Sequence, residues 1–210
     1  MKKNGFQDSD VRKALTNLVL PKGFSGTEGV FFPAQYSFAK GTSALVALQS
    51  MVDRFSLESR HSGIASGSVD FNPMQLLTIA SLVQAEGDGK DFAKISQVIR
   101  NRLRIGMPLQ FDSTIHYIRG TRGQVYLSTE ATKIPSDYNT YLHYGLPPGP
   151  VNNPGRAAMD AAMSPQDGNW IYFITVKPGD TRFTDSNAEF SLWKIEYEKN
   201  FRAGAFKSVA

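Results

Sequence analysis

Hydrophobic residues recur at helical spacing in several separate stretches of the chain. A short amphipathic helix is predicted over residues 11–18, ahead of Pro21. A second helix, capped by Thr42 or Ser43, has apolar positions spaced by three, four and three residues, at Leu45, Leu48, Val52 and Phe55. Between these helices, the aromatic runs at 30–32 and 36–38 resemble strands at a sheet edge, since Pro33 separates them.

The next stretch contains a loop and then two helices with recognisable start and stop signals. Residues 61–70 are rich in Ser and Gly, which predicts a boundary between an N-terminal subdomain, residues 1–70, and a second domain, residues 71–210. Asn72-Pro73 would open a helix that runs to Glu86. Asp91 would cap another helix over residues 92–103, and the short connection predicts an antiparallel hairpin.

The last hundred residues contain a long irregular segment followed by β and helical signals. Residues 107–155 are dense in Pro, Gly, Asn and Tyr, with one expected strand at 124–127, and a loop of that length is usually functional. Asn153-Pro154 would start a short helix. A β-hairpin is predicted over 170–184, and Ser186 with Glu189 forms a capping box for a terminal helix whose aromatic face is Phe190, Trp193, Tyr197 and Phe201. The fold class predicted is α+β.

Composition removes several classes of function. The 210 residues include no cysteine, which excludes thiolate catalysis and cysteine metal sites, and the three histidines are too scattered for a zinc motif, so we expect no metal and no cofactor. The net charge of +4 comes without any basic run, which disfavours nucleic-acid binding. No apolar stretch is long enough to cross a bilayer and no signal peptide is recognisable, so an export signal or anchor would lie outside this chain.

Glu86 is the most informative residue in the sequence. The apolar positions Leu76, Ile79 and Val83 step by three and four, and one further step reaches Glu86. Burial, together with the negative end of the helix dipole, would raise the pKa of this carboxyl and suit it to general acid catalysis. The alternative is an ordinary last-turn glutamate that is simply solvated.

Other polar residues of the irregular segment could complete a site for sugars. Asp112 and Asp137 are candidates for a second carboxylate, because hydrolytic glycosidases place two carboxyl groups across the scissile bond. Tyr138, Asn139 and the proline-rich residues 145–153 offer flat aromatic faces and amides that suit a glycan. The alternatives are loop capping by the aspartates and a purely structural loop in which Asn153 caps a helix.

Several longer motifs, in register, resemble one known family. They read ASLVQAE at 80–86, VIRNRLRIGMPLQFD at 98–112, YNTY at 138–141 and GLPPGPVNNPG at 145–155, with EGVFFP at 28–33 and KGTS at 40–43 upstream. This pattern resembles the YceG-like endolytic murein transglycosylases. The resemblance implies that residues 71–210 form a catalytic domain with a long substrate-binding loop, and that it cleaves the β-1,4 bond between N-acetylmuramic acid and N-acetylglucosamine to leave 1,6-anhydromuramic ends.

The resemblance also implies roles for individual residues. Glu86 matches the family's catalytic glutamate, which would act first as general acid and then as general base. Five further positions match the substrate cleft of the family: Gln110, Asp112, Tyr138, Asn139 and Asn153. The chain departs from the family pattern at Ser113, where proline is usual, and at Thr181 and Phe190, where histidines are common.

The resemblance further implies partners and a location. The substrate would be peptidoglycan glycan strands, with penicillin-binding synthases as protein partners, at the extracytoplasmic face of the cell envelope. The transmembrane anchor and LysM-like module usual in the family do not precede residue 28 here. Two other functions stay open: a hydrolytic muramidase that uses Glu86 and Asp112, and a peptidoglycan-binding module without catalysis.

Overall fold

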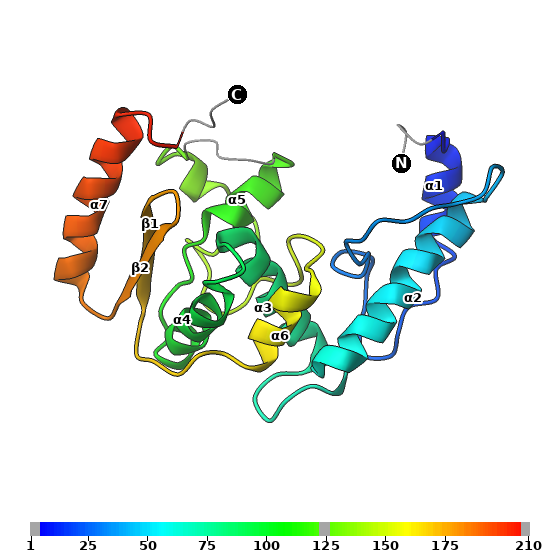
Figure 1. Ribbon diagram of the computed structural model, residues 1–210, viewed down its shortest axis with the longest axis horizontal. Coiled ribbons are helices and arrows are strands. Elements are labelled where there is room, and N and C mark those ends of the chain that lie inside the picture. Colours follow the sequence, from blue (N-terminus) through cyan, green and yellow to red (C-terminus); the bar gives the residue numbers. More distant parts are fainter. Residues whose placement is uncertain (1–4, 122–126, 207–210) are drawn as a thin grey trace.

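The computed structural model describes residues 5–121 and 127–206, and helices are its main regular elements. Helices α1 and α2 lie at one end of the molecule, α3, α4 and α6 in the middle, and a two-stranded hairpin with α7 at the other end (Figure 1). This arrangement confirms the predicted α+β class. None of the helices in the described residues is long and apolar enough to cross a membrane.

Helix α2, Ala44–Ser62, is the main element of the N-terminal part, and α1, Asp8–Leu15, packs against it. The Ser43 side chain accepts a hydrogen bond from the Val46 N–H, which confirms Ser43 as the cap. Leu48, Val52 and Phe55 are buried as the spacing predicted, but Leu45 is 39% exposed because Ala44 and Ala47 face the core instead. The helix also continues to Ser62, into the stretch predicted as a loop.

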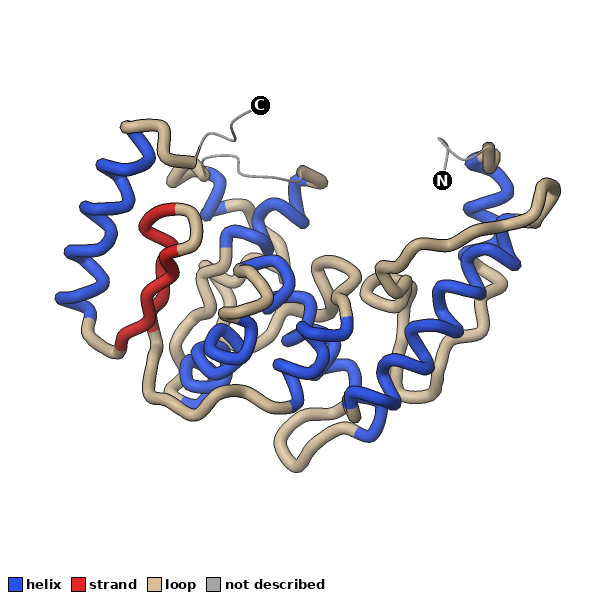
Figure 2. Tube along the Cα trace, in the orientation of Figure 1, coloured by secondary structure: helices blue, strands red, loops and turns tan. Residues whose placement is uncertain are grey.

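The two strands predicted at 30–32 and 36–38 are absent. This stretch is irregular chain that runs beside α2, drawn as loop in Figure 2. Val30 and Phe32 are buried, and the Phe32 N–H donates to the Met51 carbonyl oxygen at 3.4 Å. Their strand-like apolar pattern reflects insertion into the core, since no strand in the described part of the chain is placed to pair with them.

Helix α3, Pro73–Glu86, forms the centre of the core. Asn72 and Gln75 cap it reciprocally, Pro73 is its first residue, and every position from 76 to 83 is buried. Each large apolar side chain buried in this way contributes roughly 1.5–3 kcal/mol. The main hydrophobic core combines α3 with residues from both sides of position 70.

Helices α4, Phe92–Arg104, and α6, Arg156–Met163, pack against α3. Asp91 occupies the predicted N-cap position of α4, but it has helical backbone angles and its side chain makes no capping hydrogen bond. The predicted cap of α6 is wrong. Gly155 occupies the capping position, two residues beyond Asn153, and the Asn153 side chain is used elsewhere.

The segment 107–155, predicted as irregular, contains a helix. Helix α5, Asp112–Arg119, is followed by the short 3-10 helix η3, Ala131–Lys133. The expected strand at 124–127 lies outside the described residues except for Leu127, which is not in a strand. The spacing of Ile115 and Ile118, with Gly120 in the left-handed conformation just past the last turn, is the sequence signal for α5.

The predicted hairpin and terminal helix are confirmed. Strands β1, Tyr172–Lys177, and β2, Asp180–Thr184, pair antiparallel, and α7, Asn187–Arg202, packs against β1. Only half of the capping box forms: Ser186 accepts from the Glu189 N–H, while the Glu189 carboxylate accepts from the Thr184 hydroxyl.

Two departures from the family pattern take part in internal contacts of this region. The Phe190 ring stacks on Tyr172 at 4.9 Å between centroids, and the Thr181 hydroxyl is hydrogen bonded to the Thr175 hydroxyl at 3.0 Å. At both positions the side chain therefore packs or bonds within the hairpin and α7.

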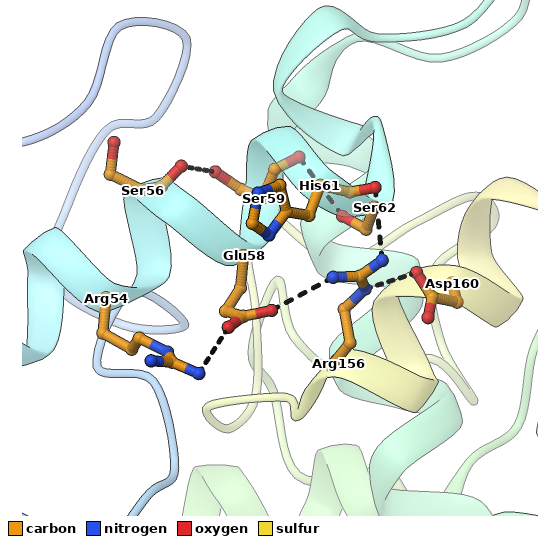
Figure 3. Close-up of polar contacts among 8 residues, drawn as sticks. All are labelled: Arg54, Ser56, Glu58, Ser59, His61, Ser62, Arg156 and Asp160. Atoms are coloured by element: carbon orange, nitrogen blue, oxygen red, sulfur yellow. Dashed lines mark hydrogen bonds and ion pairs between the residues drawn. The ribbon is translucent and has the colours of Figure 1, made fainter.

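An ion-pair cluster around the buried Glu58 joins α2 to α6 (Figure 3). Glu58, only 7% exposed, accepts from Arg54 at 2.8 Å and from Arg156 at 3.1 Å. Arg156 also pairs with Asp160 at 2.7 Å and donates to the His61 carbonyl oxygen at 3.2 Å. Helix α2 is thus joined to α6 by a carboxylate that has two cationic partners.

Candidate active site

Glu86 ends α3 with its carboxyl directed at another helix. Its Oε1 accepts a hydrogen bond from the Ser113 backbone N–H at 3.3 Å, and Ser113 is the second residue of α5. The residue before α5 is Phe111, whose side chain has no acceptor for the free N–H groups of a helix N-terminus. Glu86 therefore caps α5 from a different part of the chain.

The surroundings of Glu86 raise its pKa from 4.5 to about 7, chiefly through burial. The Asp112 carboxylate raises it further, whereas hydrogen bonding by Ser113 and the positive charge of Arg102 lower it. The upward shift predicted from burial is confirmed. A carboxyl with this pKa is populated in both protonation states near neutral pH, as a group that gives and then recovers a proton requires.

Arg102, in the last turn of α4, is the cation whose charge lowers the pKa of Glu86. It is 6% exposed, and its guanidinium donates to the carbonyl oxygens of Ile171, at 2.6 Å, and Leu109. In the sequence, Arg102 stands out only as part of the motif at 98–112. The signal was available, because residue 102 lies three positions after the buried Ile99 and so falls on the apolar stripe of α4, just as Glu86 does on α3.

Asp112 and Tyr141 form a pair beside Glu86. The Tyr141 hydroxyl donates to Asp112 Oδ1, and Asp112 itself is exposed to solvent. Burial and the Asp112 carboxylate both raise the pKa of Tyr141, so its phenol stays protonated and remains a donor. The structure brings the predicted Asp112 next to Glu86 and adds Tyr141 as the group that orients it.

Gln110 occupies the strained position of this region. Its φ of 51° is the only positive value of a non-glycine residue in the described part of the chain. The backbone is held in place by the buried neighbours Leu109 and Phe111 and by the Gln110 N–H, which donates to the Thr140 carbonyl oxygen at 3.0 Å. The side chain is exposed. Such conformations cost about 1–3 kcal/mol and concentrate at functional sites.

Asn139 holds the backbone of the loop that carries Tyr141. It is fully buried, its amide donates to the Thr132 and Ile134 carbonyl oxygens at 3.0 and 2.8 Å, and its oxygen accepts from the Tyr141 N–H at 3.0 Å. The structure leaves it no exposed surface for the direct substrate contact that the resemblance implied. Asn139 instead shapes the loop that carries Tyr141.

Tyr138 and Asn153 make contacts in which neither Glu86 nor Asp112 takes part. The Tyr138 ring lies against Tyr117 at 4.8 Å between centroids. The Asn153 side-chain oxygen accepts from the Phe31 N–H at 2.9 Å, which ties the 151–155 loop to the N-terminal part of the chain.

The polar residues of the ASLVQAE motif hold that same loop. Ser81 Oγ accepts from the Val151 N–H at 3.1 Å, and Gln84 Oε1 accepts from the Gly155 N–H at 3.0 Å. These two side chains therefore position the loop on α3, while Glu86, on another face of the helix, contacts α5. The motif combines residues that hold the loop with one carboxyl of raised pKa.

Comparisons with known proteins agree on one family. A family model described as YceG-like matches residues 1–194. The endolytic murein transglycosylase of Bacillus subtilis is 34% identical over 174 residues, which cover 81% of this chain and 48% of that protein. The enzyme of the same name in Streptococcus pneumoniae D39 is 36% identical over 158 residues, covering 70% of this chain and 28% of its own length.

A solved structure is also similar. The crystal structure of a protein described as yceG-like, from Listeria monocytogenes, superposes with a TM-score of 0.72 at 27% identity, covering 88% of this chain and 62% of that one. The chain spans about half the length of the Bacillus relative and less of the streptococcal one.

Proposed function

Since this chain belongs to the YceG-like family, we propose that it cleaves glycan strands of peptidoglycan as an endolytic lytic transglycosylase. The observation that carries the proposal is Glu86, whose carboxyl is held against the N-terminus of α5 with a pKa raised to about 7. A general acid that must recover its proton needs such a value near neutral pH.

The proposed reaction uses Glu86 twice. Protonated Glu86 donates its proton to the oxygen between N-acetylmuramic acid and N-acetylglucosamine, and the bond from C1 to that oxygen breaks. The muramic C6 hydroxyl then attacks C1, while the Glu86 carboxylate accepts the hydroxyl proton. A 1,6-anhydro end and a free 4-hydroxyl result, Glu86 is protonated again, and no water is consumed.

The neighbouring groups have distinct proposed roles. Arg102 supplies a fixed positive charge that lowers the cost of the Glu86 carboxylate between the two proton transfers. Asp112, oriented by Tyr141, presents an exposed carboxylate that can accept hydrogen bonds from sugar hydroxyls. Gln110, two residues before Asp112 in the chain, presents an exposed amide that can also bond to the glycan.

The second candidate function is hydrolysis. It is favoured by the position of Asp112, which is close enough to Glu86 to raise its pKa and could act as a base toward water. The Tyr141 hydroxyl, however, already donates a hydrogen bond to one oxygen of that carboxylate. We therefore rank transglycosylation first.

Mass spectrometry of digested sacculi tests the proposal. The wild-type protein should release muropeptides with anhydro ends, one water lighter than reducing ends. Glu86→Gln should lower the rate about 10²–10⁴-fold, whereas the matched control Glu130→Gln, at an exposed surface ion pair, should leave it unchanged. Reducing ends alone would favour hydrolysis, and full activity of Glu86→Gln would exclude Glu86 as the acid.

We also propose, from the family resemblance, that the protein acts at the cell envelope on newly made strands beside penicillin-binding synthases. Reciprocal co-purification of the protein and a synthase from cross-linked envelopes would support this partnership. Cells in which a functional tagged protein cross-links to no synthase would contradict it.

A further inference from the structure

The contact between α3 and α5 contains a group that the proposed reaction has not yet used. Ser113 offers Glu86 a backbone N–H at 3.3 Å, and its hydroxyl oxygen is buried without a hydrogen-bond partner within the described residues. We propose that Ser113 is a positioning residue that hydrogen bonds to the carboxylate form of Glu86, and so stabilises it, between the two proton transfers. This inference rests on the proposed function.

The backbone N–H has no competing acceptor at this place. Ser113 is the second residue of α5, and the first N–H groups of a helix have no acceptor within that helix. They also lie at the positive end of the helix dipole. The contact with this helix terminus by itself favours a carboxylate over a neutral carboxyl, in opposition to the burial that raises the pKa of Glu86. Ionisation of Glu86 would therefore strengthen the cap that it provides to α5.

The hydroxyl suits both states of Glu86. A buried polar atom without a partner is unusual and needs an explanation. The Ser113 hydroxyl lies close enough to Glu86 to lower the pKa of that carboxyl. Because a hydroxyl donates or accepts by rotating its proton, it can donate to the carboxylate and accept from the protonated acid.

Opposed influences set the pKa of Glu86, so the loss of either one should shift that pKa. Burial and the charge of Asp112, on α5, disfavour the carboxylate, while Ser113 and the charge of Arg102, on α4, favour it. Tyr141, from the loop after Asn139, faces the same groups and stays neutral. Removal of the Ser113 donors would leave burial and Asp112 opposed by Arg102 alone.

Two variants separate the donors. Ser113→Ala removes the hydroxyl and keeps the N–H, whereas Ser113→Pro removes both. Proline is tolerated in the first turn of a helix because the N–H there makes no intrahelical bond. Ser96→Ala is the matched control, since the hydroxyl oxygen of Ser96, on α4, is also buried and without a partner.

The first readout is the carboxyl titration of Glu86, followed by ¹³C NMR of glutamate-labelled protein and assigned with Glu86→Gln. We expect the midpoint to rise in Ser113→Ala and to rise more, by about one unit, in Ser113→Pro. Ser96→Ala should not move it. The basic limb of the rate profile on glycan strands should shift by the same amount.

The outcomes distinguish this inference from the proposed function. Cleavage that depends on Glu86, combined with an unmoved titration and rate profile in both Ser113 variants, would overturn the role of Ser113 alone. A shifted titration in a wild-type protein that cleaves no strands would overturn the proposed function and uphold the contact. If Ser113→Pro does not fold, Ser113→Ala still decides, through the smaller shift.

Discussion

Two glutamates, each at a contact between helices, are treated in opposite ways by this fold. Glu58, at the contact of α2 with α6, is bonded to two guanidinium groups at 2.8 and 3.1 Å. Glu86, at the contact of α3 with α5, has one backbone N–H at 3.3 Å, a neighbouring carboxylate and only a more distant cation. A carboxylate whose charge is matched serves to hold helices together, whereas one whose charge is incompletely matched keeps its proton available for chemistry.

The largest effect that separates the two sites is on strand cleavage. Glu86→Gln should lower the rate about 10²–10⁴-fold because it removes the acid and the base together. Glu58→Gln should retain nearly all activity at a temperature where it is folded. Release of muropeptides by the two variants, with melting curves as a folding control, makes the comparison. Equal losses of activity would mean that the contrast between the sites is wrong.

The next effect is on stability as a function of pH. Folded Glu86 keeps its proton up to about pH 7, while the unfolded chain loses it near pH 4.5. The folded state therefore binds more protons in this window, so the contribution of Glu86 to stability is fully present below pH 4.5 and is lost as the pH rises to 7. The difference in unfolding free energy between wild type and Glu86→Gln should change by about 3 kcal/mol over this range.

Urea denaturation of both proteins between pH 4.5 and pH 8 measures this difference. The wild type should lose stability relative to Glu86→Gln as the pH rises. A difference that stays constant with pH would show that the folded protein does not hold the Glu86 proton.

A smaller effect is expected from loss of the α2–α6 ion pairs. Glu58→Ala leaves Arg156 and Arg54 without their partner, and both guanidiniums retain access to water, so we expect a loss of about 2 kcal/mol rather than the 3–5 kcal/mol of a fully buried pair. Glu130→Ala, which breaks an exposed pair, should cost less than about 0.5 kcal/mol. Similar losses from both variants, measured by urea denaturation, would remove the structural role assigned to Glu58.

The smallest effect concerns the strained backbone of Gln110. Gln110→Gly relieves a positive φ and should stabilise the fold by about 1 kcal/mol, while removal of the exposed amide should lower strand cleavage. The control Gln97→Gly, inside α4, should destabilise the fold by a similar amount. A Gln110→Gly protein that is less stable than wild type would show that the backbone at this position carries no relievable strain.

Short-range patterns predicted much of the fold. Neighbouring residues were enough to predict α3, the hairpin β1–β2 and α7. The residues that begin and end each of these elements lie next to it in the sequence. Helix α5 was missed because its cap comes from Glu86 rather than from a polar residue at position 111. The strands expected at 30–38 were wrong because the apolar pattern of an inserted loop is the same as that of a strand.

The sequence by itself placed Glu86 on the same helical stripe as Leu76, Ile79 and Val83, since helical periodicity depends only on local spacing. The structure decided that its side chain is half-buried rather than fully solvated. The sequence also determined, through several motifs in register, the family to which the chain belongs. Only the tertiary structure decided which groups surround Glu86. The contacts of Ser113 with Glu86 and of Tyr141 with Asp112 join residues 27 and 29 positions apart, and such contacts depend on how helices pack rather than on any local pattern.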